Sequence, residues 1–282
     1  MLAAQPGSLL AADPASAAAT NHVATFSRTL TLAGKQVEVD FYLPRGAKKA
    51  PAAVVAHGFS RSRHNMAGWG ELLAANGFIV AVPDMPAWYD SHVNSQGISE
   101  PFDRLNTGEF TPATKPSGAG ALLGHSMGGV CTLLAAASNN AVQCWIGLDP
   151  PDLGRSAAQA ARALNKPGVV LRALPGSWNA MGGARRMLGD LSGPVLALRV
   201  EQATHCDPEN PTDWLAEMAC GKTEPNRRKV FEAYAVAALR AVFFADKAAL
   251  DRLRAATNDP AVSEVVQRRL EEFGGWRTRN KP

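Results

Sequence analysis

The fold of this chain is decided by Ala121-Leu122-Leu123-Gly124-His125-Ser126-Met127-Gly128-Gly129, where a short apolar run meets a helical pattern. The run at 121–123 is typical of a buried strand, and residues 130–137 are typical of a helix. The serine between them sits in a turn so tight that side chains two positions away would collide, which explains the flanking glycines. Such a turn lifts the hydroxyl towards the free N–H groups of the helix N-terminus. The pattern predicts a nucleophilic Ser126.

Composition limits the class of protein. The chain has 282 residues, of which 46% are hydrophobic and 19% charged, and its net charge is +4. That length is sufficient for one large domain with a single core. No basic run is interleaved with aromatic residues, so we expect no nucleic-acid partner. No window reaches the roughly 18 consecutive apolar residues of a transmembrane helix, so we expect no membrane span. We also expect a monomer.

The N-terminal segment differs from the rest of the chain. Residues 1–22 are rich in Ala, Ser and Pro without any period, which predicts a flexible arm. The arm lacks a basic n-region, and Pro6, Gly7 and Asp13 interrupt its apolar residues, so it is not an obvious signal peptide. A secreted or periplasmic chain whose signal was replaced by a start methionine fits this sequence, and so does a cytoplasmic protein.

Residues 23–282 are predicted to form one α/β domain. Segments 23–32 and 36–43 alternate apolar and polar residues, as the strands of an antiparallel hairpin do, with Gly34 at its turn. Later strands are continuously apolar and separated by helix-length segments, which indicates a mostly parallel sheet with helices on both faces. These strands are 52–56, 78–82, 121–123, 144–148, 169–171 and 195–200, and the clearest crossover helices are 66–76 and 127–138.

Two further segments have a distinct composition. The stretch 84–118 is rich in Pro, Gly, Ser and Asn and is long for a connection, so we predict a lid or binding loop there. The C-terminal part, 226–282, is predicted to be helical, over 226–245 and 247–273, with Pro260 interrupting the second helix.

A second turn, His57-Gly58-Phe59, directly follows the strand at 52–56. Beside a nucleophile on a strand-to-helix turn, one oxyanion donor is the backbone N–H after the nucleophile, which belongs to Met127. The other comes from the loop after the third strand, where Phe59 stands. We expect Gly58 to allow close approach of the substrate and His57 to orient the loop, while the side chains of Phe59 and Met127 form walls of the acyl site.

A serine hydroxyl needs a general base, and histidine suits this role because its unperturbed pKa is about 6.5. The chain order in such sites is serine, acid, histidine. His205 is the only histidine after Ser126, and it lies just beyond the strand at 195–200. We therefore predict His205 as the base. Its acidic and thiol neighbours match no tetrahedral zinc spacing, so we predict no metal site; they are Cys206, Asp207 and Glu209.

The acid must accept the other imidazole N–H and hold the ring in one tautomer. The loop after 169–171 holds no carboxylate through Asn179. The preceding strand, 144–148, ends in Asp149-Pro150-Pro151-Asp152. Asp149 is first past the strand end and is the predicted acid, with Asp152 as the alternative.

The four cysteines are too few for a disulfide scaffold. Cys206 and Cys220 flank a short helical pattern and are 14 residues apart. A bridge between them, worth about 3 kcal/mol in the chain-entropy model, and two reduced thiols are both compatible with the sequence. Cys131 and Cys144 lie on apolar segments and are predicted core residues.

With these residues placed, the chain resembles the α/β-hydrolase superfamily over nearly everything past residue 23. Gly147-Leu148-Asp149-Pro150 is similar to the chlorophyllase-like group, in which the acid follows this strand, and this favours Asp149. The His57-Gly58-Phe59-Ser60 turn and the serine motif resemble bacterial cutinases and polyester (PET) hydrolases. In those enzymes the acid normally follows the later strand, and the chain departs from them by having Ser177 and Trp178 there.

The resemblance implies an α/β-hydrolase fold and a carboxylic ester hydrolase that forms an acyl-enzyme without a cofactor. We expect apolar esters, small or polymeric and including polyesters such as PET, because the loops around the site carry Phe59, Met127, Trp88 and Trp178. Packing in the core or at an edge is the alternative for the two tryptophans. Other acyl substrates, such as amides or lactones, and a silent scaffold that only binds a ligand are the alternative functions.

Overall fold

The structure is a computed structural model and describes residues 22–111, 113–151 and 154–276. Apart from His22, the predicted N-terminal arm lies outside the described residues. The alternative acid, Asp152, also lies outside them.

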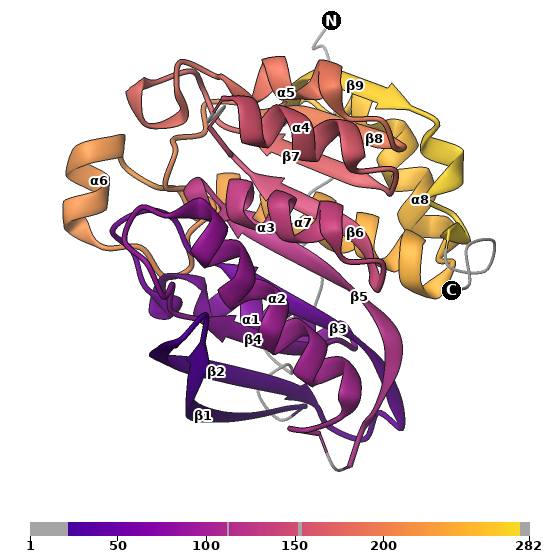
Figure 1. Ribbon diagram of the computed structural model, residues 1–282. Helices are drawn as coiled ribbons and strands as arrows, with labels where there is room; N and C mark the ends of the chain where they lie inside the picture. The colour runs from indigo at the N-terminus through magenta and orange to yellow at the C-terminus, as the bar shows by residue number, and fades with distance from the viewer. Residues whose placement is uncertain (1–21, 112, 152–153, 277–282) are drawn as a thin grey trace, which may run out of the picture.

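One twisted sheet organises the described part of the chain (Figure 1). It has nine strands in the order β1-β2-β4-β3-β5-β6-β7-β8-β9. The strands are β1 (Val23–Leu32), β2 (Lys35–Pro44), β3 (Lys49–Ala56), β4 (Ile79–Pro83), β5 (Lys115–His125), β6 (Val142–Leu148), β7 (Gly168–Arg172), β8 (Val195–Val200) and β9 (Val262–Arg268). Strands β3 to β8 pair in parallel, while β2 pairs antiparallel with both β1 and β4. This confirms the predicted mostly parallel sheet with an N-terminal hairpin.

The hairpin turn explains how β1 and β2 meet. Leu32 and Lys35 are paired residues, so only Ala33 and Gly34 form the turn, with φ of 46° and 76°. Positive φ at both central residues defines a type I′ turn, whose twist matches the right-handed twist of the strands. Gly34 adopts this conformation without a steric penalty.

Helices cover both faces of the sheet, because the apolar strands would otherwise expose two apolar surfaces. One core contains α1 (Ala67–Ala75), α7 (Pro225–Phe244) and α8 (Lys247–Arg254). The other contains α2 (Ser91–Thr107), α3 (Met127–Ser138), α4 (Arg155–Ala163) and α5 (Ala184–Asp190). The remaining helices are α6 (Trp214–Cys220) and the 3-10 helices η3 (Arg63–Met66), η4 (Ser177–Asn179), η5 (Ala255–Asn258) and η6 (Leu270–Glu272).

The prediction of a loop over the whole of 84–118 is wrong, because residues 91–107 form α2 and β5 begins at Lys115. Asp90 caps this helix by accepting hydrogen bonds from two backbone N–H groups of its first turn. Ile98, Phe102 and Leu105 recur at helical spacing and are fully buried in the core. The glycine and proline inside the helix obscured this stripe in the sequence.

The prediction of helix throughout the C-terminal part is wrong over β9, which pairs antiparallel with β8 at the edge of the sheet. One of its charges pairs across strands: Glu264 accepts hydrogen bonds from Arg172 on β7 at 2.8 Å and from Arg199 on β8 at 2.6 Å. In the sequence, the charged residues around 262–268 are typical of an exposed helix. Here Glu264 instead pairs across strands, which only the register decides.

We expect Glu264→Ala to lower the free energy of unfolding by about 1–2 kcal/mol, because it leaves the buried Arg172 guanidinium without its charged partner. Urea denaturation measures this loss. The matched control is Glu201→Ala, which removes a carboxylate 3.8 Å from Arg199 at the surface and should change stability by less than about 0.5 kcal/mol. Equal effects of the two substitutions would contradict the role given to Glu264.

Candidate active site

Ser126 lies between β5 and α3 in a strained conformation, with φ of 52° and ψ of −124°. A Cβ at Gly124 would lie 2.2 Å from the carbonyl oxygen of Gly128. A Cβ at Gly128 would lie 2.4 Å from the carbonyl oxygen of His57. Atoms cannot approach this closely, so Gly124 is required for the turn to close and Gly128 for the turn to pack against the end of β3.

His205 lies in the loop after β8, with its Nε2 atom 2.9 Å from the Ser126 hydroxyl oxygen. Two side chains anchor this loop from other elements. His125 Nε2 lies 2.8 Å from the His205 carbonyl oxygen, and Trp69 on α1 donates to the Pro208 carbonyl at 2.6 Å. The loop is therefore held at His205 itself and at Pro208.

Asp149 directly follows β6 and is buried, with φ of 47°. Its Oδ2 atom is 2.6 Å from His205 Nδ1. Its Oδ1 atom accepts a hydrogen bond from the backbone N–H of Ala173 at 2.9 Å. The structure thus brings the predicted nucleophile, base and acid into one hydrogen-bonded chain from Ser126 through His205 to Asp149.

Asn179 is a buried neighbour of this chain that the sequence analysis missed. Its side-chain N–H group donates to Asp149 Oδ2 at 2.9 Å and to the Leu174 carbonyl at 2.9 Å. Its side-chain oxygen accepts from the backbone N–H groups of Gly176 and Gly182. The loop after β7 therefore supplies an amide donor to the carboxylate. In sequence, an asparagine among glycines indicates only a turn.

The three histidines near Ser126 differ in their pKa values, because only His205 has a carboxylate hydrogen-bonded to its ring. Burial lowers the pKa of His205, but the hydrogen bond and the negative charge of Asp149 outweigh it, so the pKa is raised above its ordinary value. Burial lowers the pKa of His125 to about 3 and also lowers the pKa of His57. Of these three, only His205 is arranged to accept a proton near neutral pH.

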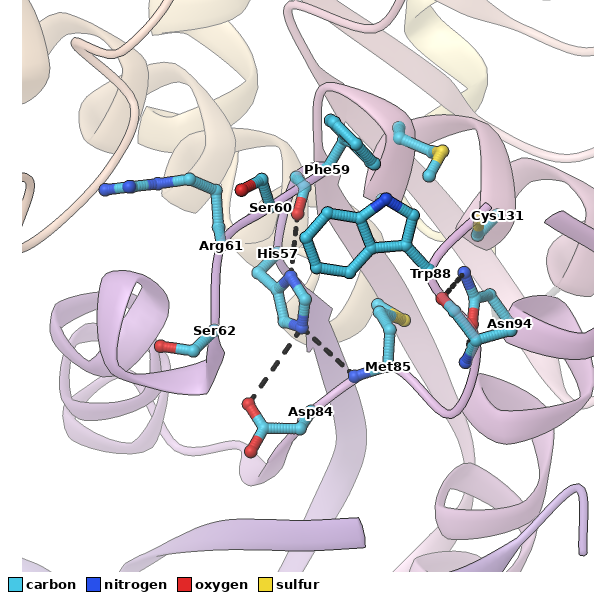
Figure 2. Close-up of a pocket in the computed structure, with 14 residues that line it drawn as sticks. His57, Phe59, Ser60, Arg61, Ser62, Asp84, Met85, Trp88, Asn94 and Cys131 are labelled. Carbon is cyan, nitrogen blue, oxygen red and sulfur yellow. Dashed lines mark hydrogen bonds and ion pairs between the residues drawn. The ribbon is translucent and has the colours of Figure 1, made fainter. Parts of the chain in front are cut away.

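The turn after β3 is oriented by His57, as Figure 2 shows. His57 Nδ1 donates to the Gly58 carbonyl at 2.8 Å, and Nε2 accepts from the backbone N–H of Met85 at 3.0 Å. A Cβ at Gly58 would lie 3.1 Å from Ser126 Cβ, so the turn passes directly beside the hydroxyl. On its other side, Met127 is the first residue of α3, and its backbone N–H has no acceptor within the helix.

Two cavities flank Ser126 and His205. The first has a volume of about 250 Å³, and its lining includes His57, Gly58, Phe59, Trp88 and Met127 (Figure 2). The second has about 210 Å³, and its lining includes Leu174, Trp178, His205 and Cys220. Trp88 is 68% exposed and Trp178 is 50% exposed, so both tryptophans lie at the rim and not in the core.

A buried ion pair links the loops on the two sides of Ser126. Arg61, after the His57 turn, donates to both carboxylate oxygens of Glu209 at 2.8 Å. Glu209 belongs to the His205 loop and is 1% exposed. Bidentate pairing of this kind fixes geometry as well as charge. The predicted base and the turn that carries Phe59 are therefore held in one unit.

Within the described ranges, no three His, Cys, Asp or Glu side chains are grouped so that they could hold a metal ion. In the same part of the chain, no helix has the length and apolar character needed to cross a membrane.

Residues 53–280 match the alpha/beta hydrolase family, and the chain belongs to this family. A curated relative, the bis(hydroxyethyl) terephthalate hydrolase of Streptomyces coelicolor, is 35% identical over 107 residues. The match covers 37% of this chain and 34% of the relative, so the chain spans about a third of that protein's length. The family and the relative together support a hydrolase activity.

We expect the imidazole of His205 to titrate above the ordinary value of about 6.5, because Asp149 stabilises its protonated form. Asp149→Asn should lower this pKa by removing the charge. NMR titration of histidine-labelled protein, assigned by single His→Gln variants, measures both. His125 should remain neutral until about pH 3 and serves as the internal comparison. A His205 pKa below 6.5 in the native protein would contradict this electrostatic account.

Proposed function

We propose that this protein is a carboxylic ester hydrolase with Ser126 as nucleophile, His205 as general base and Asp149 as the acid that orients it. The observation that carries this proposal is the hydrogen-bonded chain of 2.9 Å from Ser126 to His205 and 2.6 Å from His205 to Asp149. The chain order of serine, acid and histidine agrees with the order expected for a nucleophile on a strand-to-helix turn.

The mechanism follows from these contacts. His205 Nε2 takes the proton of the Ser126 hydroxyl as its oxygen attacks the ester carbonyl. Asp149 accepts a hydrogen bond from the Nδ1–H group of His205 and stabilises the imidazolium that forms. The backbone N–H groups of Phe59 and Met127 stabilise the oxyanion. His205 then protonates the departing alcohol, and a water molecule activated by the same imidazole releases the acid.

The two cavities suggest how an ester lies in the site. Because His205 protonates the leaving oxygen, the alcohol part belongs on its side, in the cavity lined by Trp178. The acyl part then occupies the cavity between Phe59 and Met127. The exposed ring of Trp88 packs edge-on against Phe59, with ring centroids 5.1 Å apart, and extends this apolar wall outwards.

An apolar ester is the substrate class that this lining favours. Trp88 and Trp178 offer flat apolar surfaces at the rim, where a long or polymeric ester would pass beyond the cavities. The name of the Streptomyces relative favours an aromatic diester. Polyesters such as PET therefore belong among the substrates to be tested.

We expect the native protein to react with a fluorophosphonate and to hydrolyse short p-nitrophenyl esters with a burst. Ser126→Ala and His205→Ala should each abolish turnover, and Asp149→Asn should lower kcat about 10⁴-fold through loss of the correct tautomer. Ser138→Ala, at the far end of α3, is the control. A native protein without fluorophosphonate labelling would favour the silent scaffold. Hydrolysis rates of matched amide and lactone analogues, measured beside those of the esters, distinguish ester hydrolysis from activity on other acyl substrates.

We expect Asn179→Ala to lower kcat by about 10–100-fold with little change in KM, because the Asp149 carboxylate loses a donor that holds it. The measurement is steady-state hydrolysis of a p-nitrophenyl ester across pH. Ser177→Ala in the same turn is the control and should remain near native activity. If Asn179→Ala raised KM and left kcat unchanged, Asn179 would contribute to substrate binding and not to the position of the Asp149 carboxylate.

A further inference from the structure

Helix α6 lies apart from the helices that cover the sheet, at the left of Figure 1. Its seven residues include Trp214, Leu215 and Met218, which are 66%, 59% and 74% exposed. Within the helix only Ala216 is buried. A helix this short gains little from its own hydrogen bonds, so its position depends on its attachments.

The attachments of α6 lead to the His205 loop. At the N-terminal end, Asp213 caps the helix and pairs with Arg61 at 2.7 Å. At the C-terminal end, Trp178 donates its indole N–H to the Ala219 carbonyl at 2.8 Å. A Cβ at Gly221 would lie 2.9 Å from Thr204 Cγ2, so the chain after α6 passes directly over the residue before His205.

Two thiols meet at this junction. Cys206 follows His205 and is buried, with its Sγ atom 3.9 Å from the Ala216 carbonyl. Cys220 ends α6, is partly exposed and lines the second cavity beside His205. The Ala216 carbonyl that Cys206 approaches lies one helical turn before Cys220, so the two thiols adjoin, and both cysteines are free in this structure. We propose that Cys206 and Cys220 form a disulfide that fastens α6 to the loop carrying His205.

The two cysteines have different roles in forming this bond. Cys206 is buried, and the neighbouring Cys220 thiol together with burial raises its pKa. Cys220 is partly exposed, and the neighbouring Cys206 thiol lowers its pKa. The thiolate is the reactive form, so the accessible Cys220 attacks first and the buried Cys206 completes the bond.

The reaction needs a disulfide donor, for which oxidised glutathione is a suitable small molecule. Cys220 Sγ attacks one glutathione sulfur, the glutathione S–S bond breaks, and one glutathione thiolate leaves. Cys206 then gives up its proton and attacks Cys220 Sγ, which releases the second glutathione. Two protein thiols are oxidised, one disulfide is reduced, and the two protons end on the two glutathione thiols.

The bond would restrict the loop that carries the proposed base. It closes the segment from Cys206 to Cys220 into a covalent loop. If the non-covalent contacts of α6 break, this loop leaves the helix fewer conformations. Because Cys206 is the next residue after His205, it also limits how far the imidazole can move from Ser126 when α6 detaches. In the reduced protein, α6 is held by non-covalent contacts, which include the Trp178 hydrogen bond and the Arg61 ion pair.

Trypsin provides a direct test, because cleavage after Arg199 and Lys222 leaves both cysteines in the peptide 200–222. The folded protein is incubated with oxidised glutathione, unfolded in an alkylating reagent and digested without reductant. We expect the peptide 200–222 to lack a pair of hydrogens and to carry no alkyl group. The peptide 105–155 contains Cys131 and Cys144 and should be alkylated at both, since Lys115 precedes a proline and is not cleaved.

Single variants test the order of the steps. Cys206→Ser should stop at a glutathione adduct on Cys220, and Cys220→Ser should give neither adduct nor bridge. Oxidation should raise the Tm of the native protein by about 5 °C and leave the Tm of Cys220→Ser unchanged. Full alkylation of 200–222 after oxidation, or a lasting glutathione adduct on native Cys220, would overturn the proposal. These readouts are masses and melting temperatures, so they do not depend on the proposed ester hydrolysis.

Discussion

The close approach of two backbone segments at the end of β5 is the constraint on which the site depends. Gly124 allows the turn around Ser126 to close on the start of α3, and Gly128 allows the turn to press against the end of β3, at distances that no Cβ could occupy. Helix α3 begins directly after the turn, at Met127. The same packing places the turn of His57 and Gly58 beside the hydroxyl. A side chain at either glycine would separate these elements and, with them, the proposed nucleophile from its oxyanion donors.

The remaining loops are held to this turn by buried polar contacts. Asn179 connects the loop after β7 to Asp149, while His125 connects the serine turn to the His205 loop. Arg61 and Glu209 join the loops on opposite sides of Ser126. Each contact satisfies a buried polar group that would otherwise be costly, so stability and site geometry depend on the same bonds. The high pKa of His205 has the same origin, because Asp149 is buried directly against it.

Much of the fold could be predicted because its signals are local. Continuous apolar strands and the glycine-flanked serine are visible within a few residues, and they led to the predictions of the parallel sheet and of Ser126. His205 was predicted as the only histidine after Ser126, and Asp149 from its place after the strand at 144–148 and from the family resemblance. The misassigned segments lacked such signals. Helix α2 contains a glycine and a proline that interrupt its apolar stripe, and β9 carries charges that only become paired once it lies beside β8.

By itself, the sequence determined that the chain forms an α/β hydrolase sheet and that one serine occupies a turn which only glycines can flank. Those features depend on residues that are close together in the sequence, so the local sequence pattern is sufficient to predict them. Only the tertiary structure decided that Asn179 would hold Asp149, that Arg61 would meet Glu209, and that Cys206 and Cys220 would adjoin. These contacts join loops from different strands, and their geometry exists only when the strands are paired in register.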